Sequence, residues 1–95
     1  MHIISRKTLR TFWQKYPDSQ SALIRWFKII QRNDFGDFAN LRATFPSADM
    51  VGDLIVFNIR GNKYRLIASI HFNRQKVYVR NILTHQEYDK GDWKK

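Results

Sequence analysis

Cysteine is absent from this 95-residue sequence. Its absence excludes disulfide bonds, thiolate nucleophiles and cysteine-ligated zinc, and it fits a protein of the reducing cytoplasm. Long hydrophobic runs are missing as well, because charged residues interrupt every apolar stretch before it reaches the roughly 20 residues of a membrane span. The opening residues MHIISRKTLR also lack the apolar core of a signal peptide. We therefore expect a cytoplasmic protein without a membrane partner.

Acidic residues are few. The chain has 8 Asp and Glu against 17 Lys and Arg, which gives a formal net charge of +9. Such a surface attracts polyanions, and nucleic acid is the first candidate. A basic surface that serves only solubility, or that binds an acidic protein, is the alternative.

Several catalytic motifs are missing too. The sequence has no phosphate-binding glycine loop, no GxSxG nucleophile turn and no HExxH zinc motif. Two carboxylate pairs, Asp49 with Asp53 and Glu87 with Asp89, have no histidine at a spacing typical of metal ligands. We therefore expect neither a metal nor another cofactor, and any enzyme here is a metal-independent one.

A chain of this length encloses one hydrophobic core, so residues 1–95 are expected to form a single domain. Apolar residues spaced three and four apart predict two helices that pair as a hairpin. Ser5 caps the first helix and Pro17 ends it. Asp18 or Ser19 caps the second, which stops between Asn33 and Gly36.

The remaining elements are shorter. Asp37 is predicted to cap a third helix that ends near Phe45, and residues 46–52 are predicted to form a loop. Residues 1–4 form an edge strand. Three strands with two-residue alternation follow, over residues 54–60, 63–72 and 76–83, joined by turns at Gly61-Asn62 and Asn73-Arg74. The predicted fold is α+β: a helical hairpin on one face of a small antiparallel sheet, with a short C-terminal helix.

The turns fix the strand pairing. Arg60 should lie opposite Lys63, Ile59 opposite Tyr64, Asn58 opposite Arg65, Ile70 opposite Val77, Ala68 opposite Val79 and Ile67 opposite Arg80. One face is then apolar and is covered by the helices; it comprises Ile55, Phe57, Ile59, Tyr64, Leu66, Ala68, Ile70, Phe72, Val77, Val79 and Leu83. The other face is cationic and comprises Asn58, Arg60, Lys63, Arg65, Ser69, His71, Lys76, Tyr78 and Arg80.

The predicted pairing brings two arginines together and leaves two residues outside the alternation. Arg65 and Arg80 become diagonal neighbours, roughly 7–8 Å apart, a spacing at which both guanidinium groups reach one phosphate. The ordinary alternative is that both arginines are simply solvated. Ile67 on the cationic face and Asn81 on the apolar face do not fit the alternation.

The segment from Val77 to Trp93 carries the side chains that metal-independent RNA cleavage uses. His85 exchanges protons near neutral pH and is a candidate acid or base, while arginines stabilise charge at the phosphate. Tyr88 lies three residues later on the same helical face and either transfers a proton or stacks on a nucleotide. Thr84 and Glu87 are assigned to a capping box, and Asp89 either orients His85 or is solvated.

The chain resembles the HigB family of bacterial type II toxins, within the RelE-like group of messenger-RNA interferases. The resemblance runs through MHIIS, FPSAD, VFNIRGNKYR, YVR and THQEYDKGDW, in this order. It implies a RelE/ParE-like fold and a toxin that cuts messenger RNA in the A site of the 70S ribosome. It also implies a HigA-like helix-turn-helix antitoxin, through which the complex binds operator DNA.

The family's catalytic positions fall on Arg65, Arg80, His85 and Tyr88. Asn58 and Lys63 match substrate contacts, and we assign Arg60, Asp89 and Lys90 to RNA binding as well. Relatives often carry several lysines on the catalytic face, where this chain has little beyond Lys63, so the identity of the base stays open. Two other functions remain: an RNA-binding module without catalysis, or a gyrase-targeting toxin of the same fold. An interaction-only protein for an acidic partner is the third alternative.

Overall fold

A computed structural model describes residues 1–4 and 6–94. Its elements in chain order are β1 (His2–Ile4), α1 (Arg6–Lys15), η1 (Pro17–Ser19), α2 (Gln20–Arg32), α3 (Phe38–Thr44), β2 (Asp49–Val51), β3 (Leu54–Ile59), β4 (Tyr64–His71), β5 (Lys76–Thr84), α4 (His85–Lys90) and η2 (Asp92–Lys94). The predicted α+β class is confirmed. Within the described residues, no helix has the length and apolar character needed to cross a membrane.

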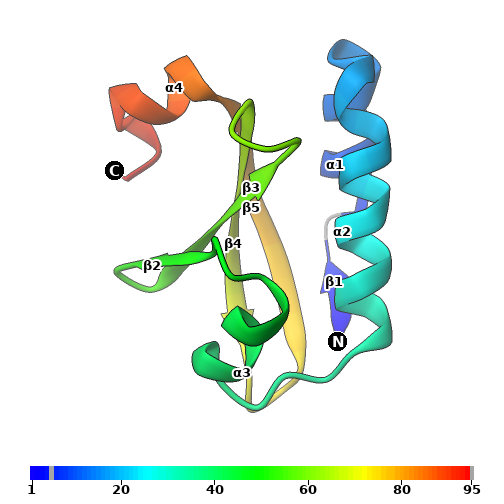
Figure 1. Cartoon of the computed structure of the whole chain (residues 1–95), viewed down its shortest axis with the longest axis vertical. Helices are drawn as coiled ribbons and strands as arrows, with labels where there is room; N and C mark the ends of the chain where they lie inside the picture. The colour runs from blue at the N-terminus through cyan, green and yellow to red at the C-terminus, as the bar shows by residue number, and fades with distance from the viewer. Residues whose placement is uncertain (5, 95) are drawn as a thin grey trace.

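The five strands form one sheet in the order β1-β5-β4-β3-β2. All neighbours are antiparallel except β1, the predicted edge strand, which runs parallel to β5. The two long helices α1 and α2 lie side by side against one face of this sheet, and α4 lies at the far end of the molecule (Figure 1). The predicted helical hairpin, three central strands and short C-terminal helix are therefore confirmed.

Helix boundaries follow local signals. Ser5, the predicted cap of α1, lies outside the described residues. Ser19 occupies the N-cap of α2, but its hydroxyl donates a hydrogen bond to the Tyr16 carbonyl at 2.7 Å instead of capping the helix. Asp37 caps α3 as predicted, because its carboxylate accepts a hydrogen bond from the Asn40 N–H at 2.8 Å.

The main core lies between the helices and the sheet. Leu9, Leu23 and Ile30 are almost completely buried there against Phe57 and Leu66. Aromatic rings join the layers, since the rings of Trp26 and Phe45 meet the Phe57 ring edge-on at 5.4 and 5.1 Å. This packing fixes the sheet as a rigid base for the segment that follows β5.

Two local predictions are wrong. Residues 49–51 form strand β2 rather than a loop, pairing Asp49 with Val56 and Val51 with Leu54. Arg60 and Lys63 do not form a strand pair, although the Asn58–Arg65 and Ile59–Tyr64 pairs are confirmed. Arg60 has a positive φ of 52°, which takes it out of the strand, and the turn closes through a hydrogen bond from the Lys63 N–H to the Arg60 carbonyl.

A β-bulge changes the second half of β5. The Ile70–Val77 and Ala68–Val79 pairs are as predicted, but Ile67 pairs with Asn81 instead of Arg80. Beyond this point every side chain of β5 changes face relative to the prediction, because a one-residue slip inverts the alternation. Ile82 consequently joins the core, and Leu83 pairs with Arg65 on the opposite face.

The bulge accounts for Asn81, one of the two residues that did not fit the alternation, and a separate apolar contact accounts for Ile67. Asn81 belongs to the face away from the helices, where it is exposed. Ile67 is fully buried on that same face beside its other register partner, Val56, and neither belongs to the main core. A small second apolar site therefore lies under the surface that was predicted to be purely cationic.

Candidate functional site

Helix α4 is fixed at both ends by short contacts. The predicted capping box is confirmed: the Thr84 hydroxyl accepts from the Glu87 N–H at 3.3 Å, and the Glu87 carboxylate accepts from the Thr84 N–H at 3.0 Å. The His85 N–H donates to the Lys63 carbonyl at 3.1 Å, which ties the helix to the β3–β4 turn. Gly91, with a φ of 76°, ends the helix in the left-handed conformation that glycine adopts without strain.

His85 and Asp89 form a pair one helical turn apart. The His85 Nδ1 atom lies 2.8 Å from the Asp89 carboxylate, and the two side chains are 46% and 59% exposed. The carboxylate therefore orients the imidazole, which was one of the two predicted roles of Asp89. The second ring nitrogen, Nε2, makes no hydrogen bond with any described residue. An imidazole held at one nitrogen and open to solvent at the other can exchange a proton with a bound substrate.

Tyr88 is held between neighbours rather than projecting freely. The Arg65 guanidinium lies over its ring at 5.2 Å from the centroid. The Trp93 ring stacks on it at 5.1 Å with an interplanar angle of 14°, and the Trp93 Nε1 donates to the Tyr88 carbonyl at 3.0 Å. This packing leaves Tyr88 only partly exposed.

Arg65 is pre-positioned by the turn that precedes β4. Its guanidinium donates to the Asn62 side-chain oxygen at 2.7 Å and to the Asn62 carbonyl at 3.1 Å. The structure thus brings Arg65, Tyr88, His85 and Asp89 together at one end of the sheet. Asn58, the register partner of Arg65, is exposed beside them on β3.

Arg80 lies farther from this group than predicted. The bulge makes Asn81 the partner of Ile67 and Leu83 the partner of Arg65, so one extra residue separates the two arginines. From strand spacing, their Cα atoms are roughly 10 Å apart instead of 7–8 Å. Arg80 is exposed and makes no hydrogen bond or ion pair within the described chain. The arginines are therefore placed to contact different parts of a nucleic-acid backbone more readily than one phosphate.

Arg60 and Lys63 are not on the predicted cationic face. Both side chains turn toward the helical hairpin, where they form ion pairs with Asp18 of η1. The Tyr64 hydroxyl donates to the same carboxylate at 2.6 Å. The assumption that strand alternation continues through the turn was wrong, because Arg60 has left the strand conformation. Any RNA contact by these two residues would compete with Asp18.

The Asp18 cluster should make stability depend on acid. Hydrogen bonds from Lys63 and then Tyr64 lower the pKa of Asp18 to about 2. A depressed carboxylate pKa adds stability above the pKa of the unfolded chain, roughly 4, and that stability is lost as the pH falls toward the folded value. We expect the melting temperature of Asp18→Asn to fall below that of the wild type at pH 6 and to approach it at pH 2.

Thermal unfolding followed by circular dichroism from pH 2 to pH 6 measures this difference. Asp53→Asn is the matched control, since Asp53 is exposed and has no ion pair with a described residue. Its difference from the wild type should not vary with pH. A constant difference for Asp18→Asn would contradict the assignment.

A shallow hollow of about 320 Å³ adjoins α4 on the face away from the helical hairpin. Asn81, Leu83, Lys90 and Trp93 contribute to its lining. The hollow places Lys90 beside a concave surface next to the catalytic candidates. Trp93 and Asn81 were not predicted as site residues. Trp93 could have been found as an aromatic just past the Gly91 helix end, whereas Asn81 depends on the bulge.

Metal ligands do not gather here. Across residues 1–4 and 6–94, no group of three or more His, Asp or Glu side chains is arranged to hold a metal ion.

Comparison with known proteins identifies related sequences over nearly the whole chain. The family model for HigB_toxin, described as the RelE-like toxic component of a toxin-antitoxin system, matches residues 19–91. The mRNA interferase toxin HigB of Escherichia coli (strain K12) is 38% identical over 92 residues, which cover 94% of this chain and 88% of that protein. An mRNA interferase HigB from Shigella flexneri matches to the same extent. Another, from Escherichia coli O6:H1, is 34% identical over 95% of this chain and 90% of its own length.

Proposed function

Because the chain belongs to the HigB family of RelE-like toxins, we propose that it is an mRNA interferase, an endoribonuclease that inhibits translation by cutting messenger RNA. Family membership makes it the toxic component of a toxin-antitoxin system. The observation that carries the catalytic part is the His85–Asp89 pair, which is exposed and lies on the same short helix as Tyr88.

The proposed reaction needs no metal. A ribose 2′-hydroxyl attacks the adjacent phosphorus, the new O2′–P bond forms, and the P–O5′ bond breaks to leave a 2′,3′-cyclic phosphate. His85 takes the 2′-hydroxyl proton, and Asp89 stabilises the imidazolium that results. Tyr88 donates a proton to the departing 5′-oxygen or positions the nucleotide. Arg65, which lies against Tyr88, stabilises the charge that builds on the phosphate oxygens, and Arg80 contacts a neighbouring part of the RNA backbone.

The substrate and partners follow from the same proposal. The messenger RNA is cut in the A site of the 70S ribosome, which places the protein in the cytoplasm. Asn58 and Lys90 flank the catalytic group and contact the RNA backbone, and Arg60 and Lys63 join them if Asp18 releases them. A HigA-like helix-turn-helix antitoxin holds the toxin inactive and carries the complex to operator DNA.

Mapping of transcript ends tests the proposal. Purified toxin is added to translating ribosomes with a reporter message, and the ends are located by primer extension. We expect cuts that follow the reading frame and move with it when one nucleotide is inserted upstream. The upstream fragments should end in a 2′,3′-cyclic phosphate, which only attack by the 2′-hydroxyl produces.

Three results would contradict it. A 3′-hydroxyl end with a 5′-phosphate on the downstream fragment would indicate metal-assisted hydrolysis instead. Intact message with arrested translation would favour binding without cleavage. DNA damage in cells whose messages remain intact would favour the gyrase-targeting relatives of this fold.

A further inference from the structure

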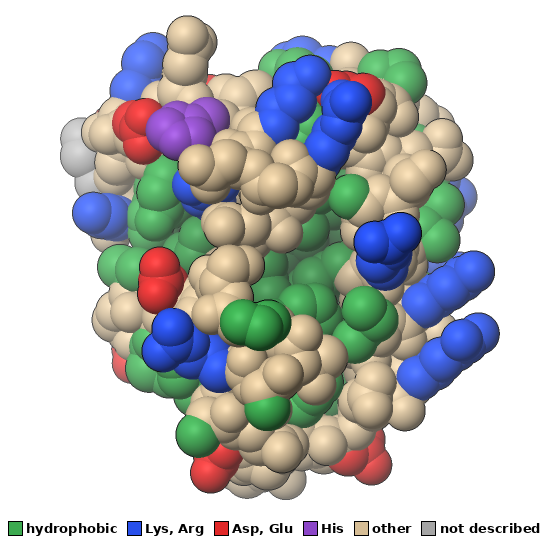
Figure 2. Space-filling model, viewed as in Figure 1, with side chains coloured by type: hydrophobic (Ala, Val, Ile, Leu, Met, Phe, Trp, Pro, Cys, Tyr) green, Lys and Arg blue, Asp and Glu red, His purple; other side chains and the backbone are tan. Residues whose placement is uncertain are grey.

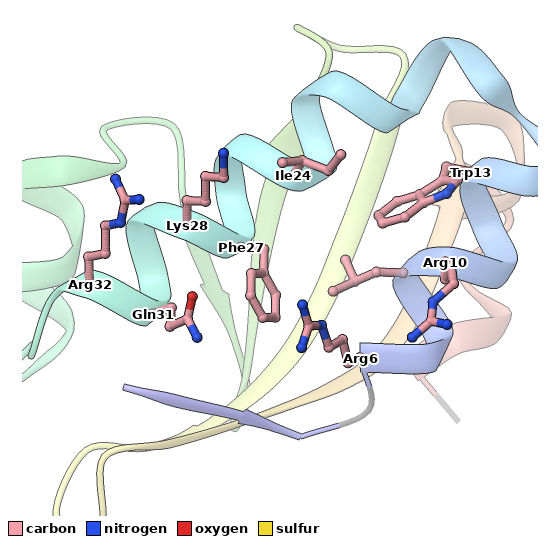
Figure 3. Close-up of a pocket in the computed structure, with 9 residues that line it drawn as sticks. Arg6, Arg10, Trp13, Ile24, Phe27, Lys28, Gln31 and Arg32 are labelled. Carbon is pink, nitrogen blue, oxygen red and sulfur yellow. The ribbon is translucent and has the colours of Figure 1, made fainter.

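The outer surface of the helical hairpin contains a groove that the ribonuclease proposal does not use. It lies between α1 and α2, has a volume of about 380 Å³, and shares no lining residue with the α4 site. Figure 3 shows Phe27 projecting between the two helices with Arg6 beside it, and Trp13 farther along α1. The Arg6 guanidinium lies 4.8 Å from the Phe27 ring centroid.

The floor of this groove is apolar and incompletely covered. Leu9 is buried at its base, while Trp13, Ile24 and Phe27 are only half-buried. The Arg6 guanidinium lies over the Phe27 ring, and the intermediate exposure of all three side chains shows that the described chain does not cover them completely. Contiguous apolar surface with a polar rim on a small protein is typical of a protein-binding site.

The rim is cationic without any countercharge. Arg10 of α1 and Lys28 of α2 are exposed and line opposite sides of the groove. Neither has an ion pair or hydrogen bond with a described residue. Helices α1 and α2 contain no Asp or Glu at all. Figure 2 shows Lys and Arg side chains projecting into solvent from the side of the molecule that α2 forms.

We propose that this groove binds an acidic amphipathic helix of the antitoxin, with its apolar side on Ile24 and Phe27 and its carboxylates against Arg10 and Lys28. An apolar floor between cationic rims is complementary to such a helix. A second copy of this chain would place like charges together across the groove. RNA would match the rims but not a floor that includes Leu9 and Ile24.

The test measures binding of purified full-length antitoxin from the same operon by isothermal titration calorimetry. The Arg10→Glu, Lys28→Glu double variant should bind about 10- to 100-fold more weakly than the wild type, because two attractions become repulsions. The matched control is Arg42→Glu, Arg74→Glu, which changes the net charge equally at exposed positions on α3 and the β4–β5 turn. The affinity of the control should stay within about threefold of the wild type, because exposed surface charges far from an interface contribute little to binding.

A second variant separates the floor from the rim. Ile24→Ala leaves every charge in place and should also weaken antitoxin binding, by roughly tenfold, because it removes apolar contact. Circular dichroism and melting temperature show that each variant is folded. Since Arg10 and Lys28 support no internal contact, their replacement should leave the melting temperature nearly unchanged.

Clear results would overturn the proposal. Wild-type affinity in both groove variants would show that the antitoxin binds elsewhere. Unchanged antitoxin binding together with lost binding of a single-stranded RNA oligonucleotide would make the groove an RNA surface. A wild-type dimer that the groove variants dissociate, seen by sedimentation equilibrium, would make it a self-association surface. The proposal depends on membership of the toxin family and not on RNA cleavage. The antitoxin affinities therefore test the groove even if the protein proves not to be a ribonuclease.

Discussion

Replacing His85 with alanine should lower the rate of messenger-RNA cleavage by about 10²- to 10⁴-fold, the range that a lost general acid or base produces. The side chain is exposed and its one polar interaction with described residues is with the Asp89 carboxylate, so the fold should not change. Growth arrest on expression without an antitoxin should disappear in parallel. The measurement is the single-turnover cleavage rate on ribosome-bound message, read by primer extension.

Histidine 71 supplies the control. His71 lies at the end of β4 against the Tyr78 ring, at 5.3 Å between centroids, and it is also exposed. His71→Ala should therefore keep the wild-type rate. Asp89→Asn should give an intermediate loss, because the imidazole remains but loses the carboxylate that orients it. A His85→Ala variant that cuts at the wild-type rate would eliminate His85 as the acid or base and leave Tyr88 as the candidate for proton transfer.

Replacing Phe57 with alanine should destabilise the protein by about 3–5 kcal/mol, the usual cost of removing a large buried aromatic. Phe57 is 1% exposed at the centre of β3, where the rings of Trp26 and Phe45 meet it. A domain of this size has a total stability of roughly 5–15 kcal/mol, so much of it would be lost. Urea unfolding followed by tryptophan fluorescence measures the change.

The control is Met50→Ala on β2. Met50 is 51% exposed, and its replacement should change stability by less than about 0.5 kcal/mol. A Phe57→Ala variant within about 1 kcal/mol of the wild type would mean that the core relaxes into the space, contrary to the close packing on both sides of the ring. Phe57→Ala also provides a comparison for toxicity. It should lose toxicity because it unfolds, whereas His85→Ala should lose toxicity while remaining folded.

The family resemblance seen in the sequence is confirmed, whereas the roles of individual site residues remain predictions. Local spacing was sufficient to find the pairs that matter most. Thr84 and Glu87 lie at capping-box spacing, and the structure has both of their hydrogen bonds. His85 and Asp89 are four residues apart on one helix, which brings their side chains together whatever the rest of the chain does.

Long-range contacts decided the rest. The side chain of Arg60 turns to Asp18 only because the β3–β4 turn and η1 meet in the folded molecule. Arg80 is itself the extra residue of the bulge, because Ala68 pairs with Val79 and Ile67 pairs with Asn81. Alternation of residue types alone cannot locate such an insertion when Arg80 and Asn81 are both polar.

The sequence by itself determined the helices, every strand except β2, the turn positions and the composition of α4, since each depends mainly on neighbours within about four residues. Only the tertiary structure decided which cations remain free, how far apart the two arginines lie, and that Trp93 covers Tyr88. These outcomes depend on interactions between residues that are distant in the chain. Which of those interactions form is decided only when the helices, the sheet and the C-terminal segment pack together.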